Sequence, residues 1–549
     1  MRRRAFLAAS TAAAGAGSLA CRRRRRGLPF EGELIGPSVD VGHAMRDLQL
    51  PSASTFEPVD VVIVGGGIAG LSAAWRLLGQ GFRSFVVLEL EEAPGGTARS
   101  GRNHVGAFPW GAHYIPAPSR DNPALVRLFQ ECGLLEPASP GAEPVVKEQY
   151  LVRAPEERVF AYGQWWEGLY LRAGANLDDE AQHARFFEEV NRLAGWRDAR
   201  GRRAFAIPRA KCSDDPEMQS LDRQSFMEWL QRRKFSSQRL YWMLDYACRD
   251  DYGSTLETTS AWAGLFYYCA RKQLRREGDG KAPVLEDSHP LVAWPEGNGF
   301  MVDHLAKACE GKLRTGHAVT TIRRPTDGLL HVHAYDVKAK AAVGFQARKV
   351  IFAGPQHVAN HVIPSLWEAR PEGLNDFIQS PWLVANLTLR KRPEEHGFPL
   401  AWDNVLRDSP SLGYVVASHQ AMKDHGPAVF TYYYPFPGQD VREARSRLMA
   451  MDWKACAQLV VEDLRKAHPD LVPCIARLDV MRWGHAMVRP RPGFCWSVAL
   501  AQAREPVNGI HFAHTDLSGL ALFEEAQDHG LRAAEEVLAA LGYAAASWR

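Results

Sequence analysis

The sequence lacks the features that mark several common protein classes. Its nine cysteines are scattered, with no C-x-x-C pair and no spacing typical of a metal site. Because nine is an odd number, a complete set of disulfides within one chain is excluded. His357 and His361 have a helical spacing that suits a metal, but no carboxylate lies between them and no third ligand is evident. We therefore predict no metal site.

An excess of charge of one sign is also missing. The formal net charge is only +3, and much of it lies in the first 26 residues, so charge gives no reason to expect a nucleic-acid partner. Beyond the N-terminal region, no stretch is long and apolar enough to span a bilayer. The chain of 549 residues is too long for one core, and its 46% hydrophobic content is ordinary for globular proteins. Two to four domains, or one large interleaved pair, are predicted.

The N-terminus, MRRRAFLAASTAAAGAGSLAC, is typical of a targeting segment. Arg3 and Arg4 precede a weakly apolar, alanine-rich run, which fits a twin-arginine export signal. We expect an exported protein, periplasmic or attached to the membrane through this end only. The ending at Cys21 loosely fits a lipidation site, although Ser18 stands where a larger aliphatic residue is usual. The alternative is a cytoplasmic protein with a disordered basic tail.

The first globular motif is a strand, a glycine turn, a helix and a second strand. Residues 59–64 (VDVVIV) read as a buried parallel strand, residues 68–81 have helical spacing, and SFVVLE reads as the next strand. The turn carries Gly65-x-Gly67-x-x-Gly70, the fingerprint of a dinucleotide site. Gly65 permits the tight turn, Gly67 lets a pyrophosphate approach, and Gly70 allows close packing of helix and strand. Glu89, 19 residues after Gly70, is placed to bind ribose hydroxyls.

A second glycine pair separates the candidate cofactors. Glu89 is followed by Gly95-Gly96-x-x-Arg99, and this extended pattern resembles the FAD-dependent amine oxidase and phytoene desaturase superfamily. Glycines without a Cβ let backbone approach a ligand, and Arg99 could pair with its pyrophosphate, or lie on the surface. The resemblance implies FAD as the cofactor.

Further blocks resemble the same superfamily. FPWGAHYI (108–115) resembles its segment along the flavin, which assigns Gly111, Ala112 and His113 to the cofactor site. In GHAVTTI the backbone of Val319 would meet adenine, and in the C-terminal block from 509 Asp516 would bind the ribityl chain. The helix after Asp516 would direct its positive end towards the flavin. Asp516 could instead cap that helix.

The resemblance implies an α/β fold in which a Rossmann-like FAD-binding domain is built from discontinuous segments, with an inserted α+β substrate-binding domain. We predict a leader and linker at 1–57, FAD-binding segments at 58–118, 291–360 and 481–549, and substrate-domain parts at 119–290 and 361–480. Helices are expected within 121–135, 222–233 and 236–253. Their aromatic residues either line a cavity or fill a large core.

One departure from the superfamily concerns a lysine that many amine oxidases place near flavin N5. The matching region reads SPWLVANLTLRK, where Ala385 or Asn386 falls near the lysine position and Lys391 comes too late. Oxidation that forms peroxide is therefore in doubt, and a dehydrogenase or desaturase that passes electrons elsewhere is equally compatible with the sequence.

The substrate side offers weaker candidates. In RWGHAMVRPRPG, Trp483 is predicted as a cavity wall and His485 as a proton acceptor near neutral pH, with a structural histidine as the alternative. The stretch CRDDYG (248–253) places two carboxylates beside Tyr252; they could bind a cationic amine, although a helix end with solvated charges is the simpler interpretation. His419 is a further candidate.

Taken together, these patterns predict an FAD-dependent oxidoreductase that removes a hydride equivalent from a C–N bond of a small organic substrate. The electron acceptor is oxygen or another molecule. One alternative is a desaturase or isomerase acting on C–C bonds of a lipid or polyene. The other is a flavin-binding subunit without catalytic activity.

Overall fold

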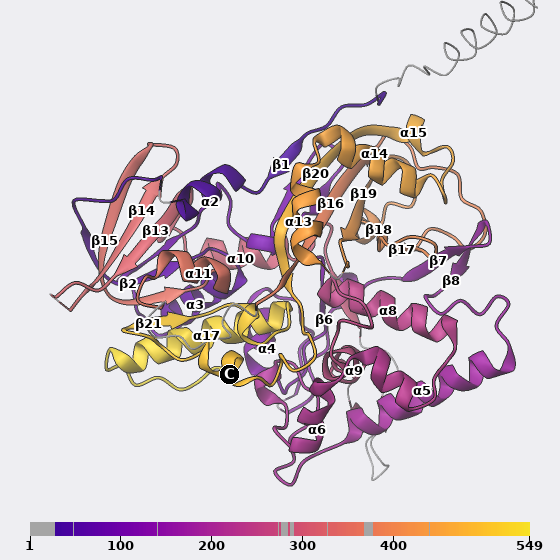
Figure 1. Ribbon diagram of the computed structural model, residues 1–549, viewed down its shortest axis with the longest axis horizontal. Coiled ribbons are helices and arrows are strands. Elements are labelled where there is room, and N and C mark those ends of the chain that lie inside the picture. Colours follow the sequence, from indigo (N-terminus) through magenta and orange to yellow (C-terminus); the bar gives the residue numbers. More distant parts are fainter. Residues whose placement is uncertain are drawn as a thin grey trace, which may run out of the picture.

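Two large β-sheets, one in each half of the molecule, organise the chain (Figure 1). The computed structural model describes residues 28–47, 49–139, 141–272, 290–326, 328–366, 377–438 and 440–549, together with two short strands, β9 (Leu274–Arg275) and β10 (Val284–Leu285). The predicted export signal and Cys21 lie outside the described residues.

The seven-stranded sheet has a parallel part that runs in the order β12-β3-β2-β15, and β21 also pairs with β15 in parallel. An antiparallel extension continues from β15 through β14 to β13. Its strands come from three separated parts of the chain: β2 (Glu57–Val64), β3 (Phe85–Leu88), β12 (Leu313–Arg314), β13 (His317–Arg323), β14 (Leu330–Asp336), β15 (Ala341–Phe352) and β21 (Ile510–Phe512). The predicted fold, a Rossmann-like sheet built from discontinuous segments, is confirmed.

Helices cover one face of this sheet and bury its aliphatic strands. Val61 and Ile63 of β2 share a core with the helices α3 (Ile68–Gly79), α4 (Pro123–Glu131), α10 (Gly299–Ala308) and α17 (Phe523–Ala540). The helix α3 packs directly on α17, so the first and last segments of the fold meet. Asn122 caps α4 by accepting a hydrogen bond from the Leu125 N–H, as the sequence predicts.

The eight-stranded sheet lies in the other half of the molecule and runs in the order β1-β20-β16-β19-β18-β17-β7-β8. Its strands are β1 (Leu34–Gly36), β7 (Glu157–Ala161), β8 (Gln164–Glu167), β16 (Gln379–Leu389), β17 (Asp403–Leu406), β18 (Gly413–Val416), β19 (Ala428–Pro435) and β20 (Ile475–Val488). The helices α13 (Val441–Ala450), α14 (Trp453–Leu464) and α15 (Leu471–Cys474) lie beside it. Two small pairs, β4 (Ser100–Arg102) with β5 (Ala107–Pro109) and β6 (Tyr114–Pro116) with β11 (Leu291–Ala293), complete the strands.

A helical layer carries the aromatic residues singled out in the sequence. It contains α5 (Leu177–Gly195), α6 (Pro216–Ser220), α7 (Phe226–Arg232), α8 (Gln238–Tyr252) and α9 (Ala261–Cys269). Trp229 and Trp262 are fully buried within one cluster of these helices. The aromatic residues of these helices therefore serve mainly as a core, which is the second of the two interpretations.

Two of the predicted boundaries need correction. Within the region expected to be linker, β1 pairs in parallel with β20, and α2 (Val39–Arg46) follows it. The boundary at 481 falls inside β20, which belongs to the eight-stranded sheet. The first error arose because the edge strand β1 has only three residues and pairs with a strand more than 400 positions away, which local patterns do not reveal. The remaining domain boundaries stay predictions.

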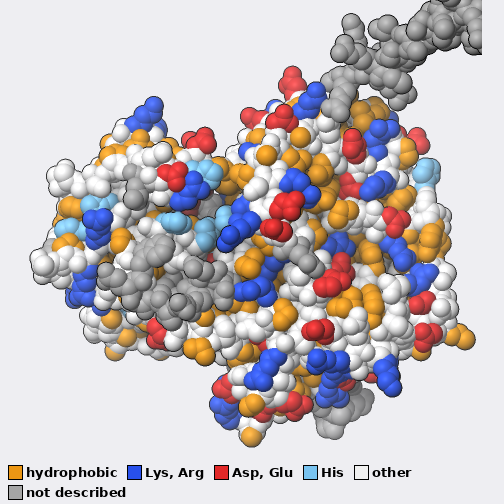
Figure 2. All heavy atoms as spheres, in the orientation of Figure 1, with side chains coloured by type: hydrophobic (Ala, Val, Ile, Leu, Met, Phe, Trp, Pro, Cys, Tyr) orange, Lys and Arg blue, Asp and Glu red, His pale blue; other side chains and the backbone are white. Residues whose placement is uncertain are grey.

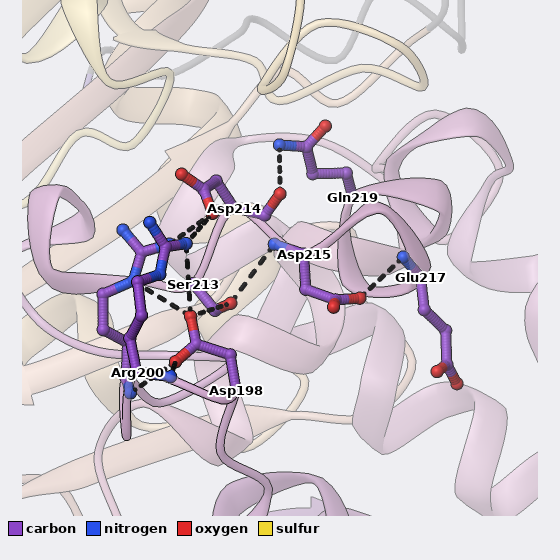
Figure 3. Close-up of polar contacts among 8 residues, drawn as sticks. Asp198, Arg200, Ser213, Asp214, Asp215, Glu217 and Gln219 are labelled. Carbon is purple, nitrogen blue, oxygen red and sulfur yellow. Dashed lines mark hydrogen bonds and ion pairs between the residues drawn. The ribbon is translucent and has the colours of Figure 1, made fainter.

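A network of hydrogen bonds and ion pairs stabilises the loop that precedes α6 (Figure 3). The Asp198 carboxylate accepts hydrogen bonds from the Arg200 N–H at 2.9 Å and from Ser213 Oγ at 2.8 Å. Asp214 pairs with Arg200 and Arg202. Asp198 and Asp214 thus each have a basic partner, which is the usual state of a carboxylate that a fold uses for structure.

Among the described residues, the eight cysteines are free thiols, and no group of three metal-ligating side chains comes together. None of the helices in the described part of the chain is both long and apolar enough to cross a membrane.

Candidate cofactor and substrate cavity

A cavity of about 450 Å³ is lined by residues of both halves of the molecule. One end is lined by the turn after β2, the segment after β3 and the strand β13. The other end is lined by side chains of α8, β16, β19 and β20. The first will be called the nucleotide end and the second the substrate end.

The glycine turn after β2 shapes the nucleotide end, and its three glycines have distinct surroundings. Gly65 has a φ of +104°, which favours glycine. A Cβ on Gly70 would lie 1.9 Å from the Gly65 carbonyl oxygen, so only glycine allows α3 to approach β2 here. A Cβ on Gly67 would meet nothing within 4 Å, and Gly67 lines the cavity. These surroundings agree with the turn, packing and ligand-approach roles expected of them.

Glu89 follows β3 directly and lines the same end of the cavity. Its carboxylate accepts hydrogen bonds from the Gly66 N–H at 2.7 Å and the Glu91 N–H at 2.9 Å, and the residue is 7% exposed. Burial raises its pKa, which the two N–H donors partly oppose. The turn thus holds Glu89 at the cavity wall, where its binding to a ribose stays a prediction.

The second glycine pair lies directly against the first. The Gly95 N–H donates to the Gly66 carbonyl at 2.8 Å, and Gly95 forms a parallel bridge with Gly67. Gly96 has a φ of +54°, and its absent Cβ would lie 3.6 Å from the Gly67 Cα. The two glycine segments therefore lie against each other and form one groove of backbone. This contact explains why the sequence has a second glycine pair after the first fingerprint.

Arg99 is not a surface arginine, so that alternative is wrong. Its side chain is 11% exposed, and a guanidinium nitrogen lies 3.4 Å from the Glu91 carboxylate. The guanidinium carbon also lies 5.7 Å from the centre of the Trp483 ring. Arg99 thus contacts a wall residue at each end but does not itself line the cavity, and its pairing with a pyrophosphate stays a prediction.

Asp516 is buried in the cavity wall, with 1% exposure. Its carboxylate accepts hydrogen bonds from the Gln356 N–H at 2.9 Å and from Gln379 Nε2 at 3.1 Å. Burial by itself raises the pKa, but His514 and the Gln356 N–H outweigh it and lower the pKa overall. The alternative that Asp516 caps the last helix is wrong, because α17 begins only at Phe523, after a short 3-10 turn that contains Asp516.

The segment Gly111–His113 passes along the cavity between the two ends. A Cβ on Gly111 would lie 2.2 Å from the Thr97 carbonyl oxygen, and the Ala112 N–H donates to that oxygen at 2.9 Å. The His113 ring stacks on Tyr433, with centroids 4.9 Å apart. Burial lowers the pKa of His113 to about 4, so the ring is neutral at physiological pH. Val319, predicted to meet adenine, also lines the cavity.

Two adjacent acids of α8 reach the substrate end, which corrects the interpretation of solvated charges. Asp251 is 4% exposed and is paired with Arg271, whose Nη2 lies 2.9 Å from its carboxylate. Asp250 also lines the cavity, and the Tyr114 hydroxyl donates a hydrogen bond to its carboxylate at 3.4 Å. Burial and the neighbouring carboxylates of Asp251 and Asp403 raise the pKa of Asp250. The sequence CRDDYG gives no sign of this arrangement, because helical periodicity does not show whether other segments pack over the end of a helix.

Trp483 and His485 alternate on β20 and both line the cavity. Trp483 Nε1 donates to the Trp110 carbonyl at 2.7 Å, which fixes the indole as a wall. The His485 ring is open to the cavity and stacks on His357, with centroids 4.0 Å apart. Desolvation and the nearby His357 and Arg445 lower the pKa of His485 to about 3. A histidine with that pKa is a weak base near neutral pH, contrary to the role expected for it.

The strand β16 carries no lysine into the cavity. Trp382 and Val384 line the cavity from one face of the strand, whereas Ala385 packs into the core on its other face. Asn386 donates from Nδ2 to the Pro109 carbonyl at 3.0 Å. None of the described residues that line the cavity is a lysine. His419, the other weak candidate, does not line it and contacts the Arg153 carbonyl.

The backbone groove and the buried carboxylates of this cavity fit a dinucleotide. The position next to Gly67 is open and any side chain there would fill it, and the wall holds two buried acids, Glu89 and Asp516, from separate segments of the chain. Fold and cavity together define a two-part dinucleotide-binding protein with a separate substrate end.

The chain belongs to the family described as flavin containing amine oxidoreductase, whose model matches residues 68–538. This membership confirms the predicted superfamily, the predicted cofactor FAD, and the class of FAD-dependent oxidoreductases.

Similarity to individual proteins is local in sequence and extensive in structure. The human peroxisomal N(1)-acetyl-spermine/spermidine oxidase is 45% identical over 93 residues, which is 17% of this chain and 17% of that protein. A putrescine oxidase bound to putrescine is 17% identical with a TM-score of 0.61, covering 88% of this chain and 100% of that one. A fatty acid isomerase from P. acnes is 16% identical with a TM-score of 0.59, covering 88% and 99%. At such identities the structural likenesses show the fold alone.

Sequence reasoning missed several cavity residues. Arg271, Trp382, Tyr433 and Glu524 come from four different elements or loops, and none was assigned a role from the motifs, although Glu524 lies within the C-terminal block that resembles the superfamily. A usable signal existed only for Asp250, as one of two adjacent acids in an aromatic helix.

Proposed function

We propose that this protein is an FAD-dependent amine oxidoreductase whose substrate is a small organic cation anchored by Asp250. The observation that carries the proposal is the state of this carboxyl group. It lies at the substrate end of the cavity, and no basic side chain of the described residues is within ion-pair distance of it. Asp250 is partly exposed to the cavity. A substrate that shields it from water leaves a carboxylate without a cationic partner, which is costly, and an ammonium group on that substrate would relieve the cost.

Other acids of the molecule show the contrast. Asp251, next to Asp250, already has Arg271 as its partner. Asp198 and Asp214 each have arginine partners (Figure 3). Asp250 thus remains available to a substrate cation; Glu524, which also lines the cavity, is a second acid without an ion pair among the described residues.

The surrounding side chains supply the rest of the substrate site. Trp382, Tyr433 and Trp483 form aromatic walls at this end, and an aromatic ring attracts a cation that lies over its face. FAD, when bound, accepts a hydride equivalent. Before a C–H bond next to nitrogen can lose hydride, the ammonium group must lose a proton. The raised pKa of Asp250 suits its carboxylate to take that proton, which leaves a neutral amine and a protonated Asp250.

Anaerobic reduction of the bound flavin tests the proposal. Purified holoprotein is mixed in a stopped-flow instrument with a panel of primary, secondary and acetylated amines and, separately, of fatty acids and polyenes. Bleaching of the flavin absorbance near 450 nm by amines is the expected result. Reduction by none of the amines would contradict it. Admission of air afterwards shows whether oxygen reoxidises the flavin or another acceptor is required.

The second candidate function is a desaturase or isomerase acting on C–C bonds. Two observations favour it: the described cavity wall carries no lysine, and it includes the apolar residues Val384, Leu412 and Leu522. Bleaching by polyenes or fatty acids and not by amines would establish this function. A flavin that no member of either panel reduces would instead indicate a subunit without catalytic activity.

We also propose that the protein is exported through the twin-arginine route. The support is the sequence MRRRAF at the N-terminus. Replacement of Arg3 and Arg4 by lysine is expected to retain the protein in the cytoplasm, as measured by cell fractionation. An unchanged distribution between fractions would contradict export by this route.

A further inference from the structure

The segment of residues 31–47, here called the N-terminal strap, precedes the glycine fingerprint and lies outside the family match. Its first part is attached to the eight-stranded sheet. The Leu478 N–H donates to the Glu31 carbonyl at 3.0 Å, and the Val480 N–H donates to the Glu33 carbonyl at 2.9 Å. Farther along, β20 carries Trp483 and His485 into the cavity. The strap therefore starts beside the wall of the substrate end.

The strap then crosses to the seven-stranded sheet. Its Ser38 donates from the backbone N–H and from the hydroxyl to the two oxygens of the Glu91 carboxylate, at 2.9 and 3.1 Å. Glu91 follows β3 and lines the nucleotide end. On the way the strap passes over Arg99, since a Cβ on Gly36 would lie 3.2 Å from an Arg99 nitrogen. Glu91 thus binds both Arg99 and the strap.

The last part of the strap, α2, closes the nucleotide end. The Met45 side chain lines the cavity and packs against the apolar cluster that contains Val319. The helix lies beside β13, the strand that carries Val319. In Figure 1 β1 and α2 run from the side of β20 towards β13 across the space between the two halves. In Figure 2 histidine and basic side chains gather over this same region.

The strap is held to the nucleotide end by few interactions. None of the residues of α2 is fully buried, and the hydroxyl of its N-cap residue, Ser38, makes no capping hydrogen bond to the helix itself. Arg46, on the same helix, is half exposed and pairs only with Asp47 next to it. Segments with few buried contacts open locally at lower free energy than a core does. The strap is therefore suited to open and close without unfolding of the two sheets.

We propose that the N-terminal strap is part of the cofactor site and retains FAD. When Ser38 is bonded to Glu91 and Met45 lies in the wall, the nucleotide end is closed. Release of FAD requires these contacts to break and α2 to lift. The proposal rests on FAD as the cofactor and is independent of which substrate the protein oxidises.

The rate of FAD release tests it. Holoprotein is diluted into an excess of an unrelated apoflavoprotein, and the transfer of FAD is followed by the change in flavin fluorescence. The double variant Ser38→Ala with Met45→Ala is expected to release FAD at least tenfold faster than the unchanged protein. Arg46→Ala is the matched control on the same helix and is expected to release FAD at the unchanged rate.

A second pair of proteins separates the strap from the residues before it. A chain that begins at residue 28 keeps the strap, and a chain that begins at residue 48 lacks it. Fast release by the shorter chain alone is the expected result, with far-ultraviolet circular dichroism showing that both keep their fold. If the shorter chain does not fold, the point variants decide. Release rates within twofold of the unchanged protein for the double variant, or a flavin that no variant releases, would overturn the proposal. Failure to find a reducing amine would leave these rates unaffected.

Discussion

The two ends of the cavity are built by different means. The nucleotide end is built around backbone: Gly67, Gly95 and Gly96 come within 30 residues of one another and line the cavity together. The substrate end is made of side chains such as Asp250, Trp382 and Tyr433, which separate elements bring together. A site formed by the backbone of one short segment therefore leaves a motif in the sequence. A site formed by side chains that tertiary packing brings together does not.

The largest effect is expected from a substitution that blocks the nucleotide end. Gly67→Leu places a side chain in the groove, where a Cβ itself meets no protein atom. We expect a folded protein without FAD, measured as loss of the absorbance near 450 nm with unchanged far-ultraviolet circular dichroism. The backbone at Gly67 is extended, with φ of −74°, and so accepts leucine without strain.

The matched control for this change is Gly70→Leu. Here a Cβ would lie 1.9 Å from the Gly65 carbonyl oxygen, so the backbone of α3 and β2 must separate. This variant is expected to lose its fold as well as its FAD. If Gly67→Leu bound FAD as tightly as the unchanged protein, the groove would not be the cofactor site.

The same comparison explains how much was predictable. The order strand, glycine turn, helix, strand and the residues Gly65, Gly67, Gly70 and Glu89 followed from local spacing, because one βαβ unit contains them all. The pairing of β1 with β20 and the covering of the end of α8 did not, because both depend on segments hundreds of residues away. The role expected of His485 assumed an ordinary imidazole pKa, and the stacking on His357 that helps to lower this pKa was not visible in the sequence.

The next largest effect is expected from a substitution at the substrate end. Asp250→Asn keeps the shape of the side chain and removes its charge, so a bound ammonium loses its partner. Charged hydrogen-bonded pairs in sites of this kind contribute about 2–5 kcal/mol, so kcat/KM for a reducing amine is expected to fall by a factor of roughly 30 to 5,000. The measurement is anaerobic flavin reduction against amine concentration.

Glu257→Gln is the matched control for Asp250→Asn, since Glu257 is an exposed acid only a few residues farther along the chain. It is expected to leave kcat/KM unchanged within twofold. Equal losses in both variants would show that overall charge, and not Asp250 itself, attracts the amine.

A smaller effect should appear with pH. Burial and the neighbouring carboxylates raise the pKa of Asp250 to about 8, so in the free protein the group is protonated below that pH and ionised above it. The profile of kcat/KM reports groups of the free protein. We expect kcat/KM for an amine to rise with pH through about 8, and this rise to disappear in Asp250→Asn. A profile that falls over the same range would contradict the assignment of the anion.

The stability of the protein should change with pH in the opposite direction to kcat/KM and fall as the pH rises. A carboxyl group whose pKa is raised by folding binds more protons in the folded than in the unfolded state between its ordinary pKa near 4 and its folded value. Its contribution to the free energy of unfolding is therefore lost as pH rises through that range. Asp250→Asn should raise the melting temperature at pH 8 and leave it nearly unchanged at pH 4. A variant that is less stable at pH 8 would show that the charge stabilises the fold.

The smallest expected effect concerns His485, and it sharpens the difference between lining a site and acting in it. Because desolvation, His357 and Arg445 lower its pKa to about 3, its neutral ring is a poor proton acceptor near neutral pH. His485→Asn should therefore change the limiting rate of flavin reduction by less than about tenfold, well below the 10²–10⁴ that general-base catalysis contributes. The pH profile should keep its rise through about 8, because Asp250 is unaltered. A drop of a thousandfold, with the rise abolished, would return the role of base to His485 and leave Asp250 as an anchor alone.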